Sequence, residues 1–306
     1  MNKIVEKEML SENVAKLVIE APQIAQKQCP GQFVIVRIDE KGERIPLTIA
    51  DADIEKKTIT LIIQKVGTSS HKIISLNPGD MLLDVSGPLG RPTKIEKVGT
   101  VLASGGGVGI APLYPIAKAF KIAGNRVITV LGARSKDLLI LEKEMAACAD
   151  EQIVMTDDGS YGKKGVITIG IEEVLKREPV NLVVTIGPAI MMKFVALLTK
   201  KYQIHTIASL NTIMVDGTGM CGGCRVKIGN EVKFACVDGP DFDGHKVDFN
   251  DLMMRLRRYK EEEKAALDRW SDNCRMMQQT PTVIPGNGTG ESTLGLPDPF
   301  EEALGG

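Results

Sequence analysis

The sequence has few aromatic residues and almost no net charge. Phe, Trp and Tyr make up 4% of its 306 residues, and only three residues are His. The 38 Lys and Arg residues are balanced by 39 Asp and Glu residues, which excludes the basic surface typical of proteins that bind nucleic acids or anionic membranes. No apolar run approaches the roughly 20 residues of a membrane-spanning helix. We therefore expect no nucleic-acid partner, no membrane association and a cytoplasmic location.

Cysteine is also sparse, and three of the six cysteines stand alone. Cys29, Cys148 and Cys274 are far from one another in the sequence, which argues against a disulfide framework and agrees with a reducing compartment. We predict that each of these three is a small, buried, apolar residue.

The other three cysteines are concentrated between residues 215 and 240. The segment Val215–Cys224 reads VDGTGMCGGC, and Cys236 follows in FACVDGP. Glycines between the cysteines allow backbone N–H groups to approach the sulfurs of a cluster. A plant-type two-iron site begins with Cys-x4-Cys-x2-Cys. Here the first position is Asp216, and the spacing is Asp-x4-Cys-x2-Cys-x11-Cys, so we predict an iron–sulfur site with one carboxylate ligand: Asp216, Cys221, Cys224 and Cys236.

Zinc is the alternative for these cysteines. Cys-x2-Cys is also a zinc spacing, and His205 or His245 could complete a tetrahedral site. The glycine-rich loop has neither a second Cys-x2-Cys nor a His-x3-His pair, so it fits zinc poorly.

The pattern of apolar residues divides the chain into segments. Residues 1–97 alternate apolar and polar positions in short runs, such as 32–37 and 58–63, which predicts a small antiparallel barrel, with a sandwich as the alternative. Residues 98–205 contain continuous apolar runs suited to buried parallel strands, and therefore predict a doubly wound α/β domain. Residues 206–250 form the cluster segment. Residues 250–274 predict one charged amphipathic helix within the C-terminal part, 251–306, and the stretch from Thr280 has the composition of a disordered tail.

Within the α/β segment, the strands alternate with helices. The predicted strands cover 100–103, 126–131, 153–156 and 182–186. The predicted helices cover 113–123, 138–147 and 171–177.

A glycine-rich loop follows the first of these strands. Residues 103–112 read ASGGGVGIAP, and such a loop before a helix can hold a diphosphate on backbone N–H groups. The loop departs from Gly-x-Gly-x-x-Gly at Ile110, and a tight turn of small residues remains an alternative. Arg134 and Ser135, and then Asp157 and Asp158, follow later strands at the edge where ligands bind in such sheets. Together these segments favour a dinucleotide site.

Two segments of the barrel could hold a flavin. Residues 44–49 read RIPLTI and residues 64–70 read QKVGTSS, which places hydroxyls and backbone donors at strand ends. By spacing alone, each could equally be an ordinary turn.

The order of barrel, GGGxGxAP loop, Gly187-Pro188 with Met191-Met192, and C-terminal cysteine loop resembles the ferredoxin–NADP reductase superfamily. Within it, the chain is similar to the small subunits of NADH-dependent ferredoxin:NADP oxidoreductases, also known as sulfide dehydrogenase subunits, and to the electron-transfer subunits of dihydroorotate dehydrogenase. The run SLNTIMVD, residues 209–216, carries the likeness most specifically. Aspartate at position 216 is similar to the former group, whereas the latter has cysteine there.

The resemblance implies an oxidoreductase subunit with a ferredoxin-reductase-like fold, FAD, a [2Fe-2S] cluster and NAD(H) as its substrate. It implies no catalytic acid or base, because hydride passes directly between stacked rings. It also implies a heterodimer with a larger flavin and iron–sulfur subunit, which would bifurcate electrons and reach ferredoxin. Two alternatives are an electron-transfer subunit for dihydroorotate oxidation and a non-enzymatic, zinc-stabilised nucleotide-binding scaffold.

The resemblance also assigns residues to each cofactor. The arginine of the family falls where this chain has Ile45, with Arg44 one residue earlier. The implied flavin contacts are Arg44, Pro46, Leu47, Thr48, Ile63, Gln64, Lys65, Gly67, Thr68, Ser69 and Ser70. The implied nucleotide contacts are Gly105, Gly106, Gly107, Val108, Gly109, Ala111, Arg134, Ser135, Asp157, Asp158 and Gly187.

Overall fold

A computed structural model describes residues 1–279, and the side chains of residues 1–272. Residues Met1–Leu267 form one compact unit, and the described residues from Asp268 to Gln279 belong to a second. The tail predicted from Thr280 lies outside the described residues. Within them, no helix is both long and apolar enough to cross a membrane.

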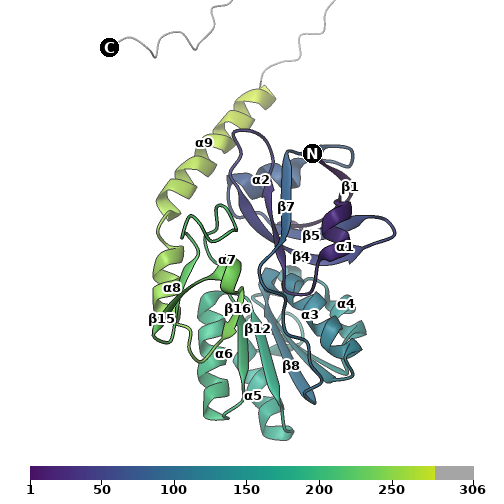
Figure 1. Cartoon of the computed structure of the whole chain (residues 1–306), viewed down its shortest axis with the longest axis vertical. Coiled ribbons are helices and arrows are strands. Elements are labelled where there is room, and N and C mark those ends of the chain that lie inside the picture. Colours follow the sequence, from purple (N-terminus) through teal and green to yellow (C-terminus); the bar gives the residue numbers. More distant parts are fainter. Residues whose placement is uncertain (280–306) are drawn as a thin grey trace, which may run out of the picture. The chain divides into compact units, whose positions relative to one another are not determined.

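The alternating residues near the N-terminus form a seven-stranded antiparallel sheet that curls toward a closed barrel (Figure 1). Its spatial order is β6-β1-β2-β5-β4-β3-β7. Leu17, Val34 and Leu61 are fully buried in one core because alternate side chains point inward. The predicted antiparallel barrel is therefore confirmed. Its elements are β1 (Asn2–Ser11), β2 (Val14–Glu20), α1 (Pro22–Lys27), β3 (Phe33–Arg37), β4 (Ile45–Asp53), β5 (Thr58–Gln64), α2 (Thr68–Ser75), β6 (Met81–Leu82) and β7 (Asp84–Leu89).

The continuous apolar runs form a second seven-stranded sheet, in the order β11-β10-β9-β8-β12-β13-β16. All its pairings are parallel except the one between β13 and β16. The predicted doubly wound α/β fold is confirmed. Its strands are β8 (Thr100–Gly106), β9 (Arg126–Ala133), β10 (Glu151–Thr156), β11 (Lys163–Lys164), β12 (Leu182–Ile186), β13 (Thr206–Ser209) and β16 (Asp241–Asp243).

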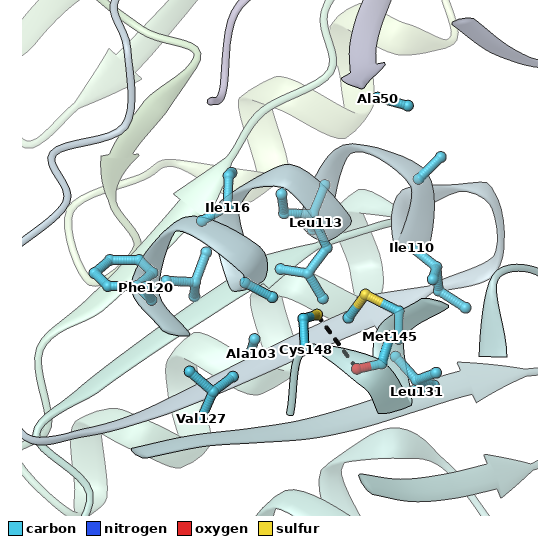
Figure 2. Packing of buried hydrophobic residues seen from close by; sticks show 14 of the residues in the cluster. Ala50, Ala103, Ile110, Leu113, Ile116, Phe120, Val127, Leu131, Met145 and Cys148 are labelled. Carbon is cyan, nitrogen blue, oxygen red and sulfur yellow. Dashed lines mark hydrogen bonds between the residues drawn. The ribbon is translucent and has the colours of Figure 1, made fainter. Parts of the chain in front are cut away.

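Helices cover both faces of this sheet (Figure 1). One face packs against α3 and α4, and Figure 2 shows Leu113 and Phe120 of α3 over Val127 and Leu131 of β9. The same cluster includes Ala50 of the barrel, so one continuous core joins the barrel to the α/β sheet. The other face packs against α5 and α6. The helices are α3 (Ile110–Ile122), α4 (Glu142–Ala147), α5 (Ile167–Arg177) and α6 (Ala189–Lys201).

The cysteine segment adds a small substructure to this sheet. A hairpin of β14 (Arg225–Ile228) and β15 (Glu231–Phe234) leads into α7 (Ala235–Asp238), and β16 then pairs with β13. Both β13 and β16 lie beyond residue 205, so the sheet extends past the predicted end of the α/β segment. Short strands at a sheet edge carry too little periodicity to be assigned from sequence.

Two predicted helices differ clearly from the structure. The helix predicted over 138–147 begins only at Glu142, because Leu141 adopts a left-handed conformation (φ 53°). The single helix predicted over 250–274 is two helices, α8 (Phe249–Leu256) and α9 (Lys260–Gln279). Bonds from Arg257 N to Met254 O and from Arg258 N to Arg255 O tighten the end of α8 and stop it.

The isolated cysteines also differ from their prediction. Cys148 is buried as predicted, and its Sγ lies 3.3 Å from Met145 O (Figure 2). Cys29 is exposed, so that prediction was wrong; it lies in the turn between α1 and β3, where no sheet covers it. The side chain of Cys274 lies outside the described part of the chain.

Candidate functional site

The cysteine segment folds as a glycine-dependent loop, residues 210–224, which we call the cluster loop. Gly217, Gly219 and Gly222 have φ values of 75°, 87° and 66°, a region that residues with a Cβ rarely adopt. A Cβ on Gly222 or Gly223 would meet no atom closer than 3.5 Å. The backbone beside Cys221 and Cys224 is therefore open to a bulky group.

Two of the predicted ligands meet directly. Cys224 and Cys236 are each 1% exposed, and their Sγ atoms lie 3.2 Å apart. Burial, together with the neighbouring Cys224, raises the pKa of Cys236 to about 12. Buried neutral thiols release protons when they bind a metal, because the thiolate is the ligand.

The other two predicted ligands meet through the backbone. Asp216 accepts hydrogen bonds from Thr218 N (2.9 Å) and Cys221 N (2.8 Å), which hold the pKa of its carboxyl below the usual value. Asp216 is therefore ionised, and its carboxylate holds the backbone of Thr218 and Cys221 close to residue 216. Among the described residues, no three His, Cys, Asp or Glu side chains already form a metal-binding group. The structure thus pairs Asp216 with Cys221, and Cys224 with Cys236.

The donor set nevertheless fits an iron–sulfur cluster. Three thiols around an open, glycine-lined turn supply the soft ligands that such clusters use, and the carboxylate of Asp216 would add a harder oxygen ligand. For the zinc alternative, the structure engages His245 elsewhere: its Nε2 lies 3.0 Å from Thr199 Oγ1 on α6. Sequence spacing could not reveal that contact.

The barrel packs against the cluster loop and the residues around Cys236. Cys224 and Cys236 share an apolar cluster with Phe33 and Ile35 of β3. A Cβ on Gly217 would lie 2.7 Å from Leu89 Cδ1, so this turn has no room for a side chain. The predicted flavin domain and the predicted cluster ligands therefore lie in direct contact.

Arg44, predicted on the flavin diphosphate, reaches the cluster loop. Its Nε donates to Val215 O (3.0 Å), and its Nη1 lies 3.6 Å from Asp84 Oδ2. The neighbouring predicted contacts Pro46, Leu47 and Thr48 are half-buried on β4, which pairs with β3.

The second predicted flavin segment surrounds the start of α2. Thr68 Oγ1 is buried and has no hydrogen-bond partner, so it is available to a ligand. Ser69 donates to Glu43 Oε2 (2.6 Å), whereas Ser70 Oγ accepts from the N–H groups of Val66 and Gly67. Ser70 therefore shapes the turn, and Thr68 offers the free hydroxyl. The remaining predicted members, Ile63, Gln64 and Lys65, close β5, and Lys65 N donates to Asn13 O.

This arrangement fits the diphosphate of FAD. An unpaired buried hydroxyl and the free N–H groups of a helix start are the donors that an anion requires. A Cβ on Gly67 would meet no atom within 4 Å, which leaves that side of the turn open.

The glycine loop lies where the strand order of the parallel sheet reverses. Strand β8 lies between β9 and β12; α3, which follows β8, covers one face of the sheet, and α5, which precedes β12, covers the other. Ligands bind in such sheets at the carboxyl ends of the strands beside this point. Gly105 and Gly106 end β8, the short turn Gly107–Gly109 follows, and Gly187 follows β12.

Close packing requires some of these glycines. A Cβ on Gly109 would lie 2.6 Å from the backbone oxygen of Ile186, whereas a Cβ on Gly106 would meet the flexible end of the Met191 side chain. Gly187 packs against Gly106, and Ala111 is buried at the start of α3. Gly107 differs, because it has φ 55° and no neighbouring atom within 4 Å. Both interpretations of the loop therefore have support: it is a tight turn, and Gly107, next to half-buried Val108, is its open position.

The remaining predicted nucleotide residues cluster at the ends of β9 and β10. Asp157 N donates to Ala133 O and Asp158 N donates to Arg134 O, so the two loops lie together. Hydrogen bonds from Ser160 hold the pKa of Asp158 below its usual value. Arg134 is exposed, and its side chain makes no hydrogen bond or ion pair with another described residue. Ser135 precedes the short turn Lys136–Leu138, and its backbone carbonyl accepts a hydrogen bond from Leu138 N.

Two residues of this region were not predicted, Arg91 and Asp241. Arg91 follows β7, and its Nε donates to Val237 O (3.0 Å). Asp241 opens β16 and accepts from Thr93 Oγ1 (2.6 Å), while its Oδ1 is buried without a partner. The Gly90-Arg91-Pro92 sequence signals a turn, but its partners lie more than 140 residues away.

Asp241 makes the stability of the chain depend on pH. Burial raises the pKa of its carboxyl, and the hydrogen bonds from Thr93 and Ser209 offset this only in part. Because the folded pKa lies above the unfolded value of about 3.9, the contribution of this group to stability is complete below that pH and is lost as pH rises through the folded pKa.

The variant Asp241→Asn keeps the acceptor for Thr93 and cannot ionise. We expect its melting temperature, relative to the unaltered chain, to rise by a few degrees as pH increases from 4 to 7. Thermal unfolding at several pH values measures this difference. A difference that stays constant over that range would contradict the role given to Asp241.

Comparisons with known proteins agree with this geometry. Residues 2–93 match the oxidoreductase FAD-binding domain family. Residues 211–248, which contain all four predicted ligands, match the iron–sulfur cluster binding domain of dihydroorotate dehydrogenase B. The chain is 48% identical, over 88% of its length and 95% of the relative, to a dihydroorotate dehydrogenase B (NAD⁺) electron transfer subunit homolog of Thermotoga maritima. It is 36% identical to a probable subunit of that kind from Methanocaldococcus jannaschii, over 72% of this chain and 81% of the relative.

Solved structures give the same picture. A chain of the NADH-dependent reduced ferredoxin-NADP oxidoreductase, studied for flavin-based electron bifurcation, matches with a TM-score of 0.85 and 46% identity. The match covers 89% of this chain and 98% of that one. A cytochrome P450 reductase from Amycolatopsis shares the fold alone, with a TM-score of 0.55 and 21% identity over 67% of this chain and 68% of the other.

Proposed function

Because the chain belongs to the family of dihydroorotate dehydrogenase B electron-transfer subunits, and is an oxidoreductase subunit that binds FAD and an iron–sulfur cluster, we propose that it carries electrons between NAD(H) and a larger partner subunit. The packing of Cys224 and Cys236 directly on β3 of the flavin-binding barrel is the observation that carries this proposal. Free thiols suit a reducing compartment, and we place the protein in the cytoplasm.

FAD, when bound, supplies the exchange of a hydride pair with nicotinamide and of single electrons with the cluster. The residues of the chain position both groups. Thr68 and the start of α2 would hold the FAD diphosphate, while Pro46, Leu47 and Thr48 would line its ring. Gly107 and Arg134 would hold the nicotinamide nucleotide at the edge of the parallel sheet. None of these residues needs to transfer a proton to the substrate, because the task of the site is alignment.

We propose Asp216, Cys221, Cys224 and Cys236 as the ligands of a two-iron cluster. The cluster loop also carries Met220, which is 88% exposed, beside exposed Val215. Exposed apolar side chains beside buried ligands suit a subunit that passes electrons to a partner docked on that face.

The larger partner defines the reaction, and here we propose the bifurcating NADH-dependent ferredoxin:NADP oxidoreductase. Aspartate at position 216, together with the 46% identity to a chain of that enzyme, favours it. The second candidate is NAD-dependent dihydroorotate oxidation, favoured by the names of the curated relatives.

Copurification and substrate dependence distinguish the two candidates. We expect the native complex, isolated anaerobically, to contain a larger flavoprotein that oxidises NADPH and reduces ferredoxin in the presence of NAD⁺. Dihydroorotate should not reduce its flavin or its clusters. Reduction by dihydroorotate but not by NADPH would contradict the bifurcating assignment and establish the second candidate.

A further inference from the structure

Two arginines of the barrel segment donate hydrogen bonds to residues next to the first and the last of the four proposed ligands. Arg44 Nε donates to the carbonyl of Val215, the residue directly before Asp216. Arg91 Nε donates to the carbonyl of Val237, the residue directly after Cys236. Both N–O distances are 3.0 Å. The two contacts span 171 and 146 residues in sequence, so they join distant parts of the chain.

Each arginine is held in place by a second contact. Arg44 Nη1 lies 3.6 Å from Asp84 Oδ2, and Arg91 Nη2 lies 3.4 Å from Asp238 Oδ1. The backbone N–H of Arg91 donates to Gly239 O (2.6 Å). A guanidinium suits this task because its planar fork offers several donors in fixed directions.

Resting on the proposed function above, we propose that Arg44 and Arg91 are positioning residues for electron transfer. They fix the cluster loop and α7 against the flavin-binding barrel, and they place two positive charges next to the proposed ligands. Neither arginine touches the reacting atoms.

The charges have a predictable electrical effect. A two-iron cluster becomes more negative when it accepts an electron, so nearby positive charge stabilises its reduced state. Both side chains are partly exposed, at 33% and 69%, which screens the effect. Each arginine should therefore raise the reduction potential of the cluster moderately.

This assignment also changes the expectation for Arg44. Because its Nε donates to Val215 O, the Arg44 side chain is directed toward the cluster loop. The FAD diphosphate is left to Thr68 and the start of α2. Neutralising Arg44 should then leave FAD occupancy near that of the unaltered chain.

Single variants Arg44→Gln and Arg91→Gln test the proposal. Arg126→Gln is the matched control, because it removes the same charge at the start of β9, where Arg126 pairs with Glu178 and Glu151. Electron paramagnetic resonance during an anaerobic redox titration of the purified full chain gives the cluster potential. Absorbance of released flavin gives the FAD content, and stopped-flow spectroscopy gives the rate of cluster reduction by NADH.

We expect each glutamine variant to raise the ratio of oxidised to reduced cluster, at a fixed ambient potential, about three- to tenfold, which for a one-electron couple is about 30 to 60 mV. The control should show no shift. Arg44→Lys and Arg91→Lys, which retain the charge, should restore most of the potential and still reduce the cluster more slowly, since the forked contact is lost.

Potentials equal to that of the control variant would overturn the proposal. Loss of FAD from Arg44→Gln with an unchanged cluster potential would also overturn it, and would return Arg44 to the diphosphate. An unaltered chain that holds no cluster after anaerobic purification would instead contradict the proposed function.

Discussion

The variant Cys224→Ser is expected to lose its iron–sulfur cluster and to retain its flavin. Cys224 is 1% exposed and faces Cys236, so serine would place a harder oxygen ligand where no other thiol can replace it. Electron transfer from NADH to a one-electron acceptor through the cluster should fall at least about 100-fold. Hydride reduction of the flavin should continue, since its proposed contacts lie on β4, β5 and α2.

Iron and acid-labile sulfide analysis, with visible absorption of the same sample, measures this result. Cys29→Ser is the matched control, because Cys29 is an exposed thiol in the turn before β3. That variant should keep the iron content of the unaltered chain. Iron retained by Cys224→Ser at the same level would show that Cys224 is no ligand.

The second large effect is expected at Gly109. A Cβ there would lie 2.6 Å from Ile186 O and 2.7 Å from Gly187 Cα, and both atoms belong to backbone. Backbone cannot rotate away as a flexible side chain can, so Gly109→Ala should lower the free energy of unfolding by about 2 to 4 kcal/mol. The ends of β8 and β12 border the proposed nucleotide site, so a displacement there should also prevent NADH from reducing the flavin of the variant.

Gly107→Ala provides the contrast within the same loop. Its Cβ would enter open space, and the positive φ alone should cost about 1 to 2 kcal/mol. Because Gly107 is proposed to face the nucleotide, the KM of the Gly107→Ala variant for NADH should rise about tenfold, while the flavin content of the variant stays unchanged. Urea unfolding and steady-state kinetics measure the two variants. Equal stability of Gly109→Ala and the unaltered chain would refute the packing role of Gly109.

The sequence predicts the fold well where periodicity is strong. Runs such as 58–63 and 126–131 form β5 and β9, because alternating and continuous apolar patterns distinguish a one-sided sheet from a buried one. The cluster loop could also be located, since closely spaced cysteines among glycines are typical of cluster and metal sites. Short strands such as β16 and the break between α8 and α9 carry no comparable pattern.

The details of the site depend on contacts between distant residues, which spacing does not contain. The resemblance predicts Arg44 on a diphosphate, and spacing does not show that its Nε contacts Val215 O, 171 residues away. Ser70 and Thr68 look alike in sequence, but only the hydroxyl of Thr68 lacks a partner. Asp241 is a lone acidic residue that belongs to no sequence motif, although burial beside Thr93 and Ser209 raises the pKa of its carboxyl.

The central claim is a continuous electron path from NADH through FAD to the cluster, and an anaerobic titration of the purified chain with NADH tests it most directly. Visible absorption should show bleaching of the flavin bands together with loss of the broader iron–sulfur absorbance. Electron paramagnetic resonance of the same samples should show a reduced two-iron signal. A protein that binds zinc, and takes up neither flavin nor iron and sulfide on reconstitution, would contradict the account.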